Sequence, residues 1–163
     1  MDTHETPVGT VTLAASAEGL TVCTFAPPDV ARERYPEATA DPAVIERTRR
    51  ELDDYFAGRL REFTVPVDLR YASAYHRTVL AGLGGVGYGR TTTYGRLAAD
   101  LGLPTSAARG VGGAMAGNPV LIVVPCHRVL GSGGALVGYA GGLEVKRRLL
   151  DLEGTQTALD FGT

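Results

Sequence analysis

The sequence predicts an α+β (α/β) chain, in which a small N-terminal domain of β-sheet and helix precedes a mainly helical, winged-helix-like domain with a helix-turn-helix. Alternating apolar residues near the N-terminus indicate paired strands, whereas short amphipathic stretches after residue 72 indicate helices. A chain of 163 residues is long enough for one compact domain or two small ones. We therefore expect an N-terminal support domain over residues 1–71 and a C-terminal domain over residues 72–163.

A β-hairpin is expected over residues 8–25, because apolar and small residues alternate on both sides of a turn at residues 18–19. Residues 27–40 are expected to form a loop. A third strand is expected over residues 63–69. Because Pro66 has no N–H to donate, this strand should lie at an edge or be irregular.

A helix is expected to begin after Asp41, because an aspartate side chain can cap the first turn and Pro42 fits the first helical position. This helix is expected to end at Gly58. Four large apolar or aromatic side chains follow at helical spacing: Ile45, Leu52, Tyr55 and Phe56.

The second half begins with an amphipathic helix expected over residues 73–83, followed by a glycine-rich connection that ends at Gly89. A shorter helix is expected over residues 93–101, with Gly102 and Pro104 ending it. These stop signals place a tight turn before the next helix.

The next helix is expected to run through Arg109 to Met115, with Thr105 or Ser106 as its N-cap. Two short helices joined by a few residues suggest a helix-turn-helix. Arg109 is the only charged side chain of the second helix. Small residues would let the helix backbone approach either the protein core or DNA closely, and the sequence leaves both possibilities open. These small residues are Ala107, Ala108, Gly110, Gly112, Gly113, Ala114 and Ala116.

A strand-like apolar run over residues 120–124 leads into Pro125, Cys126 and His127, which place one of two cysteines beside one of three histidines. A cysteine becomes a useful nucleophile when an imidazole stabilises its thiolate and the thiol is only partly buried. The proline indicates a tight turn at which backbone N–H groups face a substrate. The alternative is a buried core cysteine with an incidental histidine.

The charges are unevenly distributed, although the net charge is only −2. Residues 1–71 carry a net charge of −5, residues 72–150 carry +6 and residues 151–163 carry −3. A basic segment in an acidic chain fits a surface that faces phosphates, but it also fits a solvated helix face. The N-terminus has no signal-peptide pattern and no apolar stretch is long enough to span a membrane, so we expect a cytoplasmic protein with free thiols.

Several motifs, in order, make the chain resemble the O6-alkylguanine-DNA alkyltransferases, also called methylated-DNA–protein-cysteine methyltransferases. The resemblance covers nearly the whole chain and is strongest over residues 93–154. Its elements are Thr93-Tyr94-Gly95, Ala107-Ala108-Arg109, Val111-Gly112-Gly113-Ala114-Met115, Gly117-Asn118-Pro119, Pro125-Cys126-His127-Arg128-Val129, Gly138-Tyr139-Ala140-Gly141-Gly142-Leu143 with Lys146, and Glu153-Gly154.

The resemblance implies repair by irreversible transfer of an alkyl group from O6 of guanine, and also from O4 of thymine, in duplex DNA to Cys126. It implies that His127 removes the thiol proton through a water, that Glu153 orients the imidazole, and that Tyr94 helps to turn the nucleotide out. A thiolate is the soft nucleophile that this chemistry needs, and extruding the base costs roughly a few kcal/mol.

The remaining site residues are also carried over from the resemblance. Arg109 enters the base stack in place of the flipped nucleotide, Asn118 supports the turn that carries Cys126, and Ser132 lies near the DNA backbone. Further contacts to DNA or to the flipped base are expected from four residues: Arg128, Val129, Tyr139 and Ala140. Lys146 is expected to be helical scaffold, and His76 is expected to be unassigned surface.

We expect no cofactor and no metal, because Cys23 and His4 do not reproduce the zinc-ligand spacing of some relatives. The expected partner is double-stranded DNA containing alkylated guanine, bound by a monomer. One alternative is a non-catalytic sensor of alkylated bases like the alkyltransferase-like proteins, which lack the acceptor cysteine that Cys126 supplies. Another is a cysteine hydrolase using Cys126 and His127, which would leave the helix pair and Arg109 unexplained.

Overall fold

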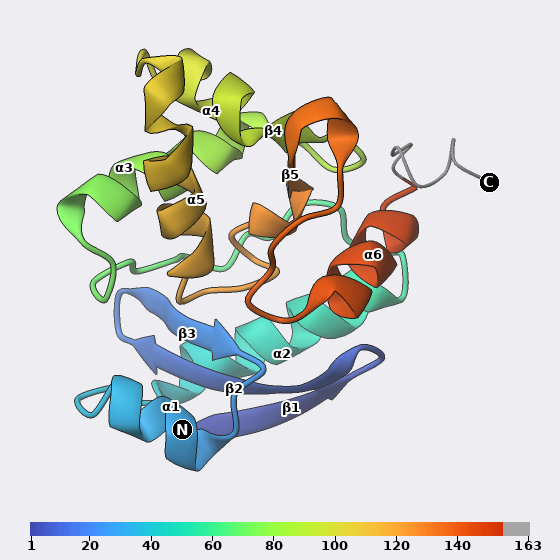
Figure 1. Ribbon diagram of the computed structural model, residues 1–163. Coiled ribbons are helices and arrows are strands. Elements are labelled where there is room, and N and C mark those ends of the chain that lie inside the picture. Colours follow the sequence, from blue (N-terminus) through green and yellow to red (C-terminus); the bar gives the residue numbers. More distant parts are fainter. Residues whose placement is uncertain (155–163) are drawn as a thin grey trace. The chain divides into compact units, whose positions relative to one another are not determined.

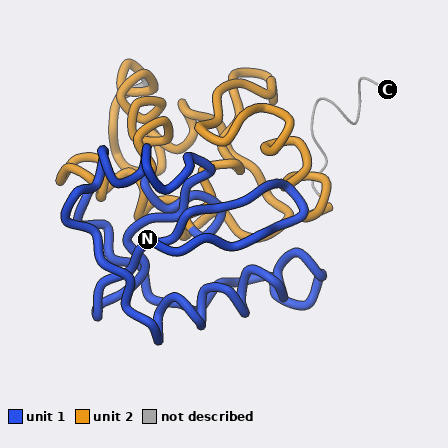
Figure 2. The backbone as a smooth tube through the Cα atoms, turned by 90° about the horizontal axis from the view of Figure 1, so that it is seen from below, with its two compact units in different colours: residues 1–71, 119–123 blue, residues 72–118, 124–163 orange. Residues whose placement is uncertain are grey.

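The computed structural model describes residues 1–154, which form two compact units (Figure 2). The first unit contains residues 1–71 and 119–123, and the second contains residues 72–118 and the described residues from 124 onward. The sequence assigns residues 119–123 to the C-terminal domain, but hydrogen bonding places them in the first unit, as described below. The last nine residues of the expected C-terminal domain lie outside the described residues.

The first unit is built on an antiparallel sheet in the order β1 (Asp2–Thr6), β2 (Gly9–Ser16) and β3 (Gly19–Thr24) (Figure 1). The expected hairpin is confirmed as β2 and β3, whereas β1 was not predicted. The turn requires Gly19, because a Cβ there would lie 2.6 Å from the carbonyl oxygen of Pro66.

The sheet packs against α2 (Pro42–Phe56), the helix expected after Asp41. The Asp41 side chain accepts a hydrogen bond of 3.1 Å from the backbone N–H of Val44, which confirms the predicted cap. The apolar side chains of one helix face are buried in the core of this unit: Ile45, Leu52 and Tyr55.

Two predictions for the first unit are wrong. The expected loop contains α1 (Pro28–Arg34), in which Pro28 at the first position and basic residues in the last turn favour a helix that buries only Ala31. The expected strand over residues 63–69 is a single bridge between Val67 and Leu20, because Pro66 offers the ladder an acceptor but no donor.

The apolar run over residues 120–124 is also not a strand. The backbone N–H of Cys23 bonds to the Pro119 carbonyl at 2.8 Å and Val120 forms one bridge with Cys23, which joins this segment to the first unit. The chain then turns at Ile122, whose φ is 72°. A positive φ at a β-branched residue is strained, so this turn is held by its buried surroundings.

The second unit is mainly helical, as predicted. Its α-helices are α3 (Ala74–Ala81), α4 (Tyr94–Asp100), α5 (Ala108–Ala116) and α6 (Leu143–Leu152). A two-stranded parallel sheet of β4 (Thr92–Thr93) and β5 (Val129–Leu130) joins its halves. Its 3-10 turns are η1 (Gly82–Gly85), η2 (Thr105–Ala107), η3 (Cys126–Arg128) and η4 (Ser132–Gly134).

The expected helix pair is α4 and α5, which pack against each other and are joined through η2. Thr93 caps α4 by accepting a 3.1 Å hydrogen bond from the Arg96 N–H. The predicted cap of the second helix is wrong, because α5 begins one residue after Ala107 and neither Thr105 nor Ser106 is its N-cap. In residues 1–154, no helix is long and apolar enough to cross a membrane.

Candidate functional site

Cys126 lies on the single turn η3, which Pro125 introduces and β5 follows. The Arg128 N–H bonds to the Pro125 carbonyl at 3.1 Å, which closes this turn. Because β5 pairs with β4, and α4 follows β4 directly, the small sheet brings the start of α4 beside the Cys126 turn. In this way Tyr94 and Cys126, 32 positions apart in the sequence, reach one site.

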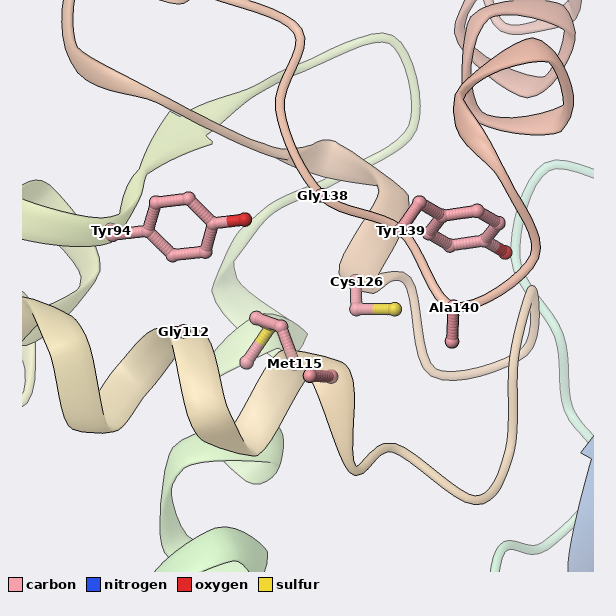
Figure 3. Close-up of a pocket in the computed structure, with 8 residues that line it drawn as sticks. Tyr94, Gly112, Met115, Cys126, Gly138, Tyr139 and Ala140 are labelled. Carbon is pink, nitrogen blue, oxygen red and sulfur yellow. The ribbon is translucent and has the colours of Figure 1, made fainter.

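A cavity of about 210 Å³ lies at Cys126 (Figure 3). The Cys126 sulfur points into it, between Met115 of α5 and the segment that carries Tyr139. The lining residues come from α4, α5, η3 and the segment before α6: Tyr94, Gly112, Met115, Ala116, Cys126, Gly138, Tyr139 and Ala140. The structure therefore brings together four predicted site residues, namely Tyr94, Cys126, Tyr139 and Ala140.

Three residues predicted to contact DNA or base lie elsewhere in the second unit. Val129 is fully buried in β5 and does not line the cavity. Ser132 is exposed on η4. Arg109 is exposed in the first turn of α5 and forms no hydrogen bond or ion pair within the described residues. An exposed, unpaired guanidinium on a helix of small residues is available to a ligand.

Asn118, which is expected to support the turn of Cys126, is buried. Its side-chain N–H donates to the Val124 carbonyl at 3.1 Å, and its side chain also forms a hydrogen bond with Cys126. Asn118 thus fixes the residues before the cysteine and contacts the cysteine itself.

His127, Glu153 and Arg128 form a buried network. His127 Nε2 lies 2.8 Å from Glu153 Oε2. Arg128 donates from Nε to Glu153 Oε1 at 2.8 Å and from Nη2 to Oε2 at 3.1 Å. A carboxylate only accepts hydrogen bonds, so a neutral His127 must carry its proton on Nε2. Its Nδ1 is buried without a partner and presents a lone pair.

The prediction that Arg128 contacts DNA or base is not supported by its position. Its side chain is 9% exposed, and its third donor, Nη1, bonds to the Val86 carbonyl at 2.8 Å. All three of its donor nitrogens therefore point to acceptors inside the second unit. Arg128 lines neither the cavity nor the surface.

Lys146, the only lysine of the chain, is completely buried on α6. Its ammonium donates to the carbonyls of Val129 at 2.7 Å, Val137 at 2.7 Å and Gly138 at 3.0 Å. Three N–H groups thus meet three acceptors. Of these three acceptors, Gly138 lines the cavity. Sequence reasoning treated Lys146 as scaffold, and the signal that could have marked it is that it is the only lysine of the chain.

The protonation states follow from burial. Burial raises the pKa of the Cys126 thiol to about 11, although the hydrogen bond from Asn118 and the charge of Lys146 oppose this. Burial lowers the pKa of His127, although Glu153 opposes this. The expected partly exposed thiol is wrong, since Cys126 is only 3% exposed. Both groups are neutral at neutral pH, so forming the thiolate requires a proton transfer.

Tyr94 keeps its phenolic proton, because burial and the neighbouring Cys126 raise its pKa. Its hydroxyl reaches the Val137 carbonyl only at 3.5 Å, a long contact that a ligand can replace. Within residues 1–154, no three histidine, cysteine, aspartate or glutamate side chains gather as a metal site would require.

Nearly the whole chain is similar to known proteins. Residues 2–69 match the ribonuclease-like domain of 6-O-methylguanine DNA methyltransferase and residues 74–155 match its DNA binding domain. The chain is 40% identical over 159 residues to the methylated-DNA–protein-cysteine methyltransferase of Mycobacterium tuberculosis, covering 98% of this chain and 94% of the relative. It is 44% identical over 126 residues to the inducible one of Bacillus subtilis, covering 76% and 69%.

A solved structure gives the same relationship. The crystal structure of Mycobacterium tuberculosis OGT in complex with DNA superposes with a TM-score of 0.80 at 38% identity, covering 98% of this chain and 95% of that chain. The similarity therefore extends through both units.

Proposed function

This chain belongs to the 6-O-methylguanine DNA methyltransferase family and repairs alkylated DNA by direct reversal, and on that premise we propose that Cys126 is the residue that accepts the alkyl group. One observation carries the proposal: the sulfur of Cys126 points into a cavity walled by Tyr94 and Tyr139. His127, the next residue, presents an unpartnered Nδ1. A nucleophile, a base and a pocket of aromatic and small side chains are the parts that this chemistry needs.

The transfer proceeds in two balanced steps. His127 Nδ1 takes the thiol proton of Cys126, through one water, and Glu153 stabilises the imidazolium that forms. The thiolate then attacks the alkyl carbon of O6-alkylguanine, so that an S–C bond forms and the C–O6 bond breaks with its electron pair on oxygen. Overall, the proton that leaves Cys126 is gained by the guanine. No group in this scheme removes the alkyl from sulfur, so each chain reacts once.

The guanine is bound in the cavity after it has left the base stack. Tyr94 donates a hydrogen bond to the base edge as charge develops on it, which its protonated phenol allows. Tyr139 and Ala140 line the opposite side of the cavity and contact the base. Val129, buried in β5, supports this pocket through backbone groups instead of touching the base.

Extrusion of the nucleotide costs roughly a few kcal/mol. Arg109 offsets this cost by entering the stack from α5, since its guanidinium has no partner in the described part of the chain. The small residues around it allow the α5 backbone to approach the DNA closely. Ser132, exposed on η4, contacts the DNA backbone.

The two units have different roles in this proposal. The first unit, residues 1–71 with 119–123, is a support domain. The second unit binds DNA and carries out the transfer, with Asn118 holding the turn of Cys126. The protein acts as a monomer in the cytoplasm, and its two cysteines remain free thiols. The sensor alternative is not favoured, because Cys126, His127 and Glu153 are all present.

The deciding experiment is the intact mass of the protein after incubation with a duplex that contains one O6-methylguanine, followed by peptide mapping. We expect one added methyl group on Cys126 that saturates at one per chain. Cys126→Ser should prevent the gain and keep lesion binding, whereas Cys23→Ala is the matched control and should leave the gain unchanged. An unchanged mass with tight, lesion-selective binding would instead identify a sensor.

A further inference from the structure

Arg128 follows His127 directly and shares the carboxylate of Glu153 with it. The guanidinium donates to both carboxylate oxygens, at 2.8 and 3.1 Å, and His127 shares the second oxygen at 2.8 Å. A fork of two parallel bonds fixes the plane of a carboxylate. The orientation of Glu153 is therefore set by Arg128, and the orientation of the His127 ring follows from Glu153.

The same arginine is tied to the glycine-rich segment after α3. Its Nη1 bonds to the Val86 carbonyl at 2.8 Å, and the guanidinium lies over the Tyr88 ring, 6.0 Å from its centroid. The Tyr88 hydroxyl in turn donates to the Leu152 carbonyl at 3.2 Å, one residue before Glu153. Arg128 thus has fixed contacts on both sides and cannot rotate away from Glu153 without losing them.

The charged groups around His127 determine whether its ring binds a second proton. Glu153 at the end of α6 attracts a proton to the imidazole, whereas Arg128 in the same turn and Lys146 within α6 repel it. Cys126 beside it carries no charge while protonated. A buried glutamate paired with His127 alone would favour an imidazolium, which has no lone pair left for a base. Arg128 offsets the Glu153 charge at contact distance.

We propose that Arg128 is a positioning residue of the alkyl-transfer site, which holds Glu153 against His127 Nε2 and cancels its charge so that His127 Nδ1 stays unprotonated and able to accept the Cys126 proton. This inference rests on the proposed function of His127 as the base. It replaces the DNA-contact role that the resemblance implied, since the side chain is only 9% exposed and each of its three nitrogens already donates to an acceptor inside the unit.

The test is the pH profile of single-turnover methyl transfer from an O6-methylguanine duplex at saturating protein, from pH 5.5 to 8.5. In Arg128→Met, the acid limb of the pH profile should move to higher pH by roughly one unit, because the uncompensated Glu153 raises the pKa of His127. The rate at pH 6 should then fall several-fold. Arg128→Lys restores the charge but not the fork, so its acid limb should return while its plateau rate stays reduced.

The second readout is an NMR titration of histidine-labelled protein, in which the His127 resonance should move with the acid limb. The control is Arg50→Met on α2, an exposed position of the first unit, and it should leave the profile unchanged. An acid limb that stays in place in Arg128→Met, or a loss that is equal at every pH, would overturn the inference. If Arg128→Met does not fold, the test rests on Arg128→Lys. A plateau rate equal to that of the wild type in this variant would show that the two parallel bonds from Arg128 to Glu153 are not needed, and would overturn the inference.

His127→Gln separates this inference from the proposed function. If it removes the acid limb and most of the rate, His127 is the base, and an unmoved limb in Arg128→Met refutes only the role of Arg128. If His127→Gln transfers at the normal rate, the base assignment itself is wrong and the Arg128 inference falls with it.

Discussion

Lys146→Met is expected to destabilise the protein by about 3 kcal/mol at pH 7. The ammonium bonds to three carbonyls, of Val129, Val137 and Gly138, and hydrogen bonds from a charged donor contribute roughly 1.5–3 kcal/mol each. Burying the charge costs several kcal/mol, which offsets much of that sum. Methionine fills a similar volume but leaves the three carbonyls without donors.

The difference between wild type and Lys146→Met should grow with pH. Burial lowers the pKa of Lys146 to about 8 from its ordinary value of 10.5. Between these values the unfolded chain binds more protons than the folded one, so the free energy of unfolding of the wild type rises with pH through this window. Relative to pH 7, the gain at pH 9.5 is about 2 kcal/mol, and the variant lacks it.

The assay is urea unfolding of both proteins at pH 7 and pH 9.5, with the difference between them taken at each pH. Groups that titrate equally in both proteins cancel in that difference. A variant as stable as the wild type at pH 7 would refute the contribution of the three hydrogen bonds. A difference that is the same at both pH values would show that these carbonyls hold the lysine pKa near its ordinary value.

Three further predictions concern the site and its support. Arg109→Ala should slow transfer from duplex DNA more than transfer from the free O6-methylguanine base, because only the duplex needs its stack filled; equal losses in both assays would remove Arg109 from that role. Asn118→Ala should lower the free energy of unfolding by about 1–3 kcal/mol, measured by urea unfolding, because the buried Val124 carbonyl loses its donor. Affinity for duplex DNA, measured by anisotropy, should fall steeply as salt increases from 50 to 200 mM, and an affinity indifferent to salt would show that the basic segment over residues 72–150 is not the interface.

Local sequence signals were sufficient to predict α2 and the first hairpin. Asp41 and Pro42 mark the start of α2, and the alternating residues around 18–19 mark the hairpin of β2 and β3. By contrast, α1 buries only Ala31, so it has almost no apolar periodicity to reveal it. The run over residues 120–124 is apolar because it is buried, and a buried turn and a buried strand have the same composition.

The site could be predicted only in part, because the sequence does not reveal contacts between residues that are far apart in the chain. The motif order predicts Cys126, His127 and Glu153 as site residues, but no spacing in the sequence indicates that Arg128 binds the carboxylate of a residue 25 positions away. The family resemblance implied that Arg128 contacts DNA or the flipped base. Only the folded chain shows that its side chain is buried with a bond from each nitrogen, because that depends on where α6 ends relative to η3.

The two cysteines show how much of the chemistry depends on such contacts. Both are buried, and burial raises the pKa of Cys23 to about 12 and that of Cys126 to about 11. Burial is the only cause that acts on Cys23, whereas Asn118 and Lys146 both act on Cys126 to favour its thiolate. Of the two cysteines, Cys126 is the one that lines the cavity beside Tyr94 and Tyr139. The same side chain is therefore inert in β3 and suited to accept an alkyl group in η3, because the second position supplies a donor, a cation and room for the base.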